Sequence, residues 1–128
     1  MTFLSRWQPQ LLSILRIVTA YMFILHGTAK VFGMPVDMSA GFEWLSLKGA
    51  AAILEIVGGT LLLLGLGTRP VAFLLSGHMA VAYFMVHASW FPLAKGGEAA
   101  ALFSFIFIYI AAAGGGAWAL DNAIGRDN

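Results

Sequence analysis

The chain has no cysteine and little charge: only 10% of its 128 residues are Asp, Glu, Lys or Arg. The lack of cysteine excludes a disulfide framework, a thiolate metal site and a CxxC redox pair. Redox chemistry in this protein therefore requires a bound molecule. The formal net charge is only +1 and the basic residues do not cluster, so nothing indicates nucleic-acid binding.

Hydrophobic residues are abundant instead, at 60% of the chain, and the mean hydropathy is +0.86. A soluble domain of this length needs more polar surface, so the composition predicts an integral membrane protein. Four apolar segments are each close to the ~20 residues that cross a bilayer. They predict an all-α fold, a bundle of four transmembrane helices in one domain over residues 1–128, at about 11–32, 49–67, 70–91 and 98–118. The first run exceeds the ~7–15 residues of a signal-peptide core, so we expect it to be a retained helix.

The one long connection, residues 33–48, is too apolar for a fully solvated loop. We expect it to lie on the membrane surface or to cap the bundle. An even number of spans puts both termini on one side. The two sides of the membrane would otherwise carry equal numbers of Lys and Arg, and Arg16 adds one to the side of the termini. Because cytoplasmic loops carry more Lys and Arg, this favours cytoplasmic termini.

The first helix carries an ordered polar stripe. Spacings of 3 and 4 residues put five of its side chains on one face: Arg16, Thr19, Phe23, His26 and Lys30. An ionisable residue facing lipid costs ~2.5–3.5 kcal/mol on insertion scales. The stripe is therefore predicted to face protein or water.

Helical rise predicts that ionisable residues from all four helices meet near one end of the bundle. This group comprises His26, Lys30, Glu55, His87 and Glu98. Tyr83 lies one turn below His87, and Tyr109 lies at about mid-membrane on the face of Glu98. Glu55 shares a face with small residues that permit close helix approach. We expect it to pair with His26 or Lys30.

The Glu55 pair has two interpretations: a neutralised structural contact, or a proton-active or ligand-binding site. At the other end, Asp121 is within reach of Arg16, and this pair is interpreted as structural. His78 has no obvious partner from the sequence and is interpreted as a core histidine. No spacing specifies a metal site, although a carboxylate–histidine site near Glu55 is conceivable.

Three stretches resemble the DoxX family of small bacterial membrane proteins: LRIVTAYMFILHGTAKVFG, EIVGGTLLLLGLGTRPVA and GGEAAALFSFIFIYIAAAGGGAWALD. Six residues fall on the pattern of the family, in order: Arg16, His26, Lys30, Glu55, Glu98 and Asp121. The resemblance implies a four-helix bundle in the cytoplasmic (inner) membrane. Some relatives are linked to thiosulfate:quinone oxidoreduction and others to membrane oxidoreductase assemblies.

We therefore expect a quinone-associated membrane subunit. Glu55 and His26 are the predicted proton relay and catalytic groups; the predicted ligand-binding residues are Lys30, Tyr83, His87, Glu98 and Tyr109. Without a flavin or nicotinamide motif, electrons come from a redox partner protein or a soluble reductant. Two alternatives stay open: a small proton-coupled transporter or channel, acting as a homo-oligomer, and a non-catalytic assembly partner. Haem b requires facing histidines, as His26 and His87 would provide.

Overall fold

The computed structural model describes residues 2–86 and 97–125, and all regular structure within these residues is helical. The predicted all-α class is thus confirmed. The elements are α1 (Thr2–Ser5), α2 (Gln8–Phe32), α3 (Leu47–Ile53), the π-helical turn η1 (Leu54–Gly58), α4 (Gly59–Leu64), α5 (Thr68–Val86), α6 (Glu98–Ala113) and α7 (Leu120–Ala123).

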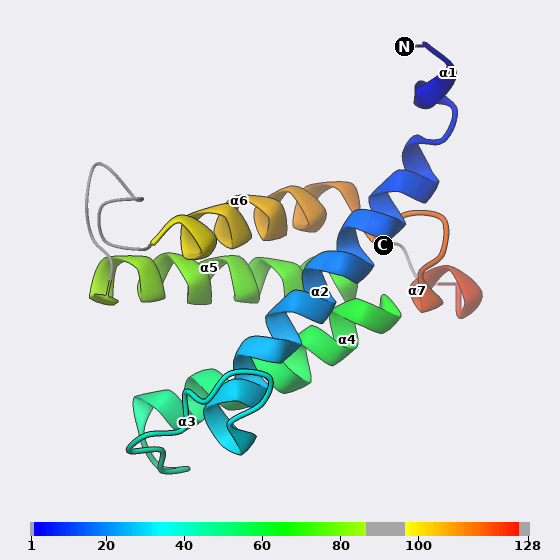
Figure 1. Ribbon diagram of the computed structural model, residues 1–128. Helices are drawn as coiled ribbons and strands as arrows, with labels where there is room; N and C mark the ends of the chain where they lie inside the picture. The colour runs from blue at the N-terminus through cyan, green and yellow to red at the C-terminus, as the bar shows by residue number, and fades with distance from the viewer. Residues whose placement is uncertain (1, 87–96, 126–128) are drawn as a thin grey trace.

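The helices form two hairpins (Figure 1). In the first, α2 packs along the continuous rod of α3, η1 and α4; in the second, α5 packs along α6. Figure 1 shows the second hairpin running across the first rather than parallel to it. The hairpins meet where η1 and α4 contact α5 and where α2 contacts α6. The centre of α5 therefore lies close to η1.

Two of the described helical segments are long and apolar enough to span a membrane, Gln8–Phe32 and Leu47–Leu64. The helix α6 has only 16 residues. It ends at Ala113 because Gly114 adopts a φ of 88°, so it stops short of the predicted end at 118. The predicted end of the third helix, at 91, lies outside the described residues. A count of four spans therefore remains a prediction.

The core between the hairpins is aromatic. Phe23 of α2 packs edge-on against Phe107 of α6 at 5.0 Å between ring centroids, and Phe103 stacks on Phe107 at 5.7 Å. Within the second hairpin, Ser76 Oγ donates to the Ser104 carbonyl at 2.8 Å, and Ser104 Oγ donates back to the Ser76 carbonyl at 3.0 Å. Such serine bonds hold helices together where no water competes.

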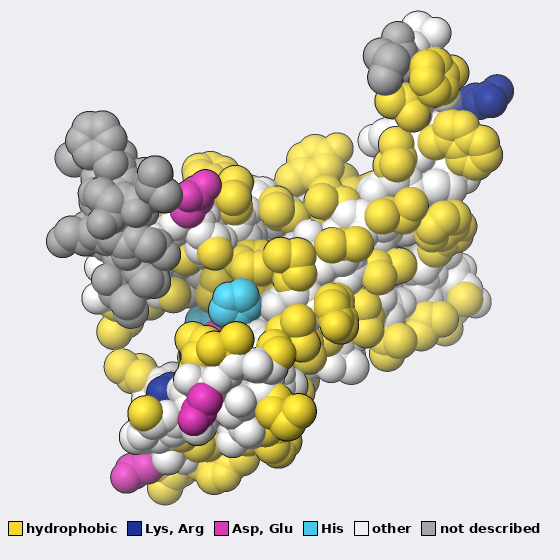
Figure 2. All heavy atoms as spheres, viewed as in Figure 1, with side chains coloured by type: hydrophobic (Ala, Val, Ile, Leu, Met, Phe, Trp, Pro, Cys, Tyr) yellow, Lys and Arg dark blue, Asp and Glu magenta, His cyan; other side chains and the backbone are white. Residues whose placement is uncertain are grey.

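The connection between α2 and α3 is irregular and exposes large apolar side chains, among them Met34, Val36, Trp44 and Leu45. It begins at Gly33, whose φ of 73° ends α2. Figure 2 shows that hydrophobic side chains cover most of the described part of the visible face. This surface is typical of a protein surrounded by lipid.

Candidate functional site: a buried carboxylate between two hairpins

The site begins with a local irregularity in the second helix. Five residues, Leu54–Gly58, form a π-helical turn within an otherwise α-helical rod. Such turns are rare and occur frequently at functional sites. Gly27 of α2 lies directly against this turn, because a Cβ built on it would be 3.1 Å from the Cβ of Glu55 and 3.2 Å from the Ala52 carbonyl oxygen. The close approach presses Glu55 into the interface.

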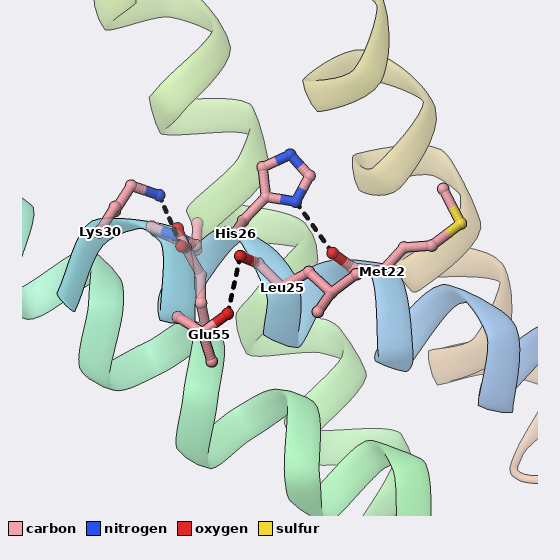
Figure 3. A network of polar contacts seen from close by, with 7 residues as sticks. Met22, Leu25, His26, Lys30 and Glu55 are labelled. Atoms are coloured by element: carbon pink, nitrogen blue, oxygen red, sulfur yellow. Dashed lines mark hydrogen bonds and ion pairs between the residues drawn. The ribbon is translucent and has the colours of Figure 1, made fainter. Parts of the chain in front are cut away.

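Glu55 is 1% exposed and binds one partner through each carboxylate oxygen. Lys30 Nζ donates to Oε1 at 2.5 Å, as Figure 3 shows, and His78 Nε2 lies 3.1 Å from Oε2. Lys30 comes from α2 and His78 from α5. A single carboxylate therefore joins the two hairpins. A buried carboxylate without such partners would carry a large desolvation penalty.

The predicted pairing of Glu55 with Lys30 is thus found, whereas the pairing with His26 is not. His26 Nδ1 lies 3.0 Å from the Met22 carbonyl oxygen of its own helix (Figure 3), and its ring packs edge-on against Phe103 at 5.6 Å. Figure 2 shows histidine between the two hairpins, where the face is hollowed. His26 is half-buried near the site, but none of its described contacts is with the Glu55 carboxylate.

The sequence shows no obvious partner for His78 and predicts a core histidine, whereas the structure gives it a partner in Glu55. The depths estimated from helical rise assume that the axes of all four helices are aligned. Because the second hairpin crosses the first, the middle of α5 meets η1. The signal in the sequence was an ionisable residue in the middle of an apolar segment.

The other predicted ligand-binding residues are dispersed. Tyr83 packs edge-on against Phe84 at 5.5 Å, while Glu98 is exposed at the start of α6. Tyr109 lines a separate groove with residues of α1 and the start of α2. His87 lies outside the described residues. Within the described residues, Tyr83, Glu98 and Tyr109 make no contact with Glu55.

A second groove lies beside the carboxylate. It is an open groove of about 730 Å³, and its lining comes from η1, α5 and α6. Most of the lining is apolar, including Leu54, Phe73 and Ile108. Among the described residues that line it, His78 is the one that is ionisable. The imidazole that contacts Glu55 is therefore also part of the groove wall.

A separate buried cluster surrounds Arg16, which is 1% exposed. Its guanidinium donates to the carbonyls of Gly115, Leu63 and Trp118. Asp121 is also 1% exposed, and its charge acts on that of Arg16. Its carboxylate accepts the backbone N–H groups of Gly67 and Thr68, at 2.9 and 3.0 Å, and so caps α5. The sequence placed Asp121 within reach of Arg16, but it did not predict this cap.

The Arg16 cluster lies where the segment before α7 meets the start of α2. The N–H of Ala117 donates to the carbonyl of Pro9 at 3.1 Å, and the N–H of Trp118 donates to Ser13 Oγ at 2.9 Å. The segment before α7 thus packs on the first turns of α2.

Chemically, the arrangement combines a buried carboxylate, a lysine amino group and an imidazole where the two hairpins meet. Lys30 neutralises the carboxylate, while His78 is able to exchange a proton with it. The fold and the site define a helical membrane protein with a buried acid–base cluster beside an apolar groove.

Comparison with known proteins agrees with this class. The family model of DoxX matches residues 11–88. An "uncharacterized protein" of Haemophilus influenzae is 48% identical over 126 residues, which cover 93% of this chain and 94% of that relative. No solved structure matches. The chain belongs to the DoxX family, whose members are membrane-associated.

Proposed function

We propose that this DoxX protein binds a membrane-dissolved quinone, as a subunit of an oxidoreductase system in the bacterial cytoplasmic membrane. The observation that carries the proposal is the position of His78, which contacts Glu55 and at the same time lines the apolar groove. A quinone needs an apolar site for its ring and tail and a hydrogen-bonding group at a carbonyl oxygen. The groove and His78 provide both.

When bound, a quinone supplies a centre that accepts two electrons and two protons. The electrons come from a redox partner protein. His78 donates a hydrogen bond at the groove wall and exchanges a proton with Glu55. Lys30 forms the ion pair with the Glu55 carboxylate. Its side chain also extends from the buried carboxylate toward the surface of the protein, because it is 17% exposed and the side chain of Glu55 only 2%.

The proposal includes four membrane crossings with both termini in the cytoplasm. The packing of the segment before α7 on the start of α2 supports an even number of crossings. The exposed apolar connection between α2 and α3 would then lie at the opposite membrane surface.

Binding of a short-chain benzoquinone to the purified protein in lipid nanodiscs tests the proposal. We expect saturable binding, quinone that co-purifies with gently solubilised protein, and slower quinone reduction by membranes carrying Glu55→Gln. If quinone neither binds nor co-purifies and Glu55→Gln leaves reduction unchanged, the proposal is wrong. Proton-coupled transport in proteoliposomes without a redox partner would instead favour a transporter.

A further inference from the structure

Gly77 precedes His78 in α5 and lines the same groove. A glycine inside a helix is destabilising relative to alanine because it loses more backbone entropy on folding. A glycine inside a helix is therefore expected to have a role that offsets this loss of stability, and that role is usually close packing against a neighbouring element.

The other helical glycines of the site have that reason. A Cβ on Gly27 would lie 2.6 Å from Ile56 Cγ1, one on Gly59 would lie 2.6 Å from Ile24 Cγ1, and one on Gly58 would lie 2.9 Å from Leu75 Cδ2. Each of these glycines permits two helices to approach. Their role is explained by packing alone.

Gly77 differs from them. A Cβ built on Gly77 meets no heavy atom within 4 Å in the described part of the chain, and the residue is exposed. Its backbone conformation does not require glycine, because Gly77 lies within a helix and its φ is not positive. The space that the missing side chain leaves opens into the groove next to His78.

We propose that Gly77 is a size-determining residue of the groove: its missing side chain leaves a path by which an apolar ligand reaches the His78 imidazole sideways from the lipid. The inference rests on the proposed function. It fits the rest of the wall, because Phe73, Leu74 and Val81 of the same helix are exposed apolar side chains that border the groove. A ligand dissolved in the acyl chains would meet this opening without crossing the polar headgroups.

The test compares Gly77→Ala and Gly77→Leu with the wild type, using the dissociation constant for a short-chain benzoquinone in nanodiscs and the thermal unfolding midpoint. Ala112→Leu is the matched control, because Ala112 is exposed on α6 and does not line the groove. We expect Gly77→Leu to weaken binding at least about tenfold. The unfolding midpoint of both Gly77 variants should equal or exceed that of the wild type. Ala112→Leu should bind as the wild type does.

Three results would overturn the inference. If Gly77→Leu binds like the wild type while His78→Phe binds poorly, Gly77 does not set the size limit and the proposed function survives. If Gly77→Leu lowers the unfolding midpoint or changes the oligomeric mass, Gly77 packs against a second helix instead. If the wild type does not bind the quinone, both proposals fail.

Discussion

His78 and Glu55 meet at 3.1 Å between Nε2 and Oε2, although they lie on different hairpins. The contact gives a groove-lining imidazole a direct connection to a buried carboxylate.

The two histidines near the site should differ in importance. His78→Phe should weaken short-chain benzoquinone binding by up to about tenfold, because a hydrogen bond between neutral groups contributes ~0.5–1.5 kcal/mol. His26→Phe is the matched control, since it keeps the ring contact with Phe103. It should change binding less than about twofold. A loss of binding in His26→Phe alone would contradict the structural assignment.

Removal of Lys30 should destabilise the fold strongly. In Lys30→Met, Glu55 keeps only His78 as a partner, and breaking a buried ion pair from one side costs about 3–5 kcal/mol. The free energy of unfolding in lipid measures this loss. Lys48→Met is the control, because Lys48 Nζ donates to the Ala40 carbonyl in the exposed connection and lies away from Glu55. That variant should lose no more than about 0.5 kcal/mol.

Arg16 should be required for the segment before α7 to pack on the start of α2. Arg16→Met removes the donors to the carbonyls of Gly115, Leu63 and Trp118 and leaves Asp121 with less charge compensation. We expect a loss of about 3 kcal/mol or more in the free energy of unfolding. Arg6→Met changes an exposed side chain and should have little effect. Equal stability of the two variants would rule out a stabilising role for the cluster.

Two glycines with positive φ allow the effect of backbone strain to be measured apart from the effect of packing. Alanine at Gly65 (φ 75°) or at Gly41 (φ 68°) should lose ~1–2 kcal/mol of stability, because it must adopt a left-handed conformation. Only Gly65→Ala adds a clash, because its Cβ would lie 2.6 Å from the Cβ of Ala119. A Cβ on Gly41 meets nothing within 4 Å. Gly65→Ala should therefore lower the unfolding midpoint well beyond Gly41→Ala.

The connection between α2 and α3 should respond to acid. Hydrogen bonds from the Ser39 side chain and N–H lower the pKa of Asp37 below its usual value. The carboxylate therefore stabilises this turn above the pKa of the unfolded chain, and the contribution disappears as the pH falls through the lowered folded-state pKa. The amide proton shift of Ser39 should follow this titration. In Asp37→Asn the same shift should not titrate in that range.

The sequence predicted the elements better than their arrangement. Hydropathy located the apolar helices, and the polar stripe of α2 is confirmed, because Arg16, Thr19 and Phe23 are buried. The small residues beside Glu55 correctly indicated close approach, as Gly58 and Gly59 contact α5 and α2.

The contact between Glu55 and His78 could not be predicted without knowing that the two hairpins cross. Residue counts along straight, parallel helices placed His26 at the depth of Glu55 and His78 far below it. The inclination of α5 reverses this order, and it depends on many packing contacts that no local pattern encodes. The π-helical turn is likewise invisible in the sequence, because Leu54–Gly58 has no breaking residue before its end.

The central claim is that His78 and Glu55 act as one unit on a ligand in the groove. The most direct measurement is a double-mutant cycle of the short-chain benzoquinone dissociation constant in nanodiscs, with Glu55→Gln, His78→Phe and the double variant. The account predicts that the double variant binds about as weakly as His78→Phe alone. Additive losses, or unchanged binding in Glu55→Gln, would contradict it.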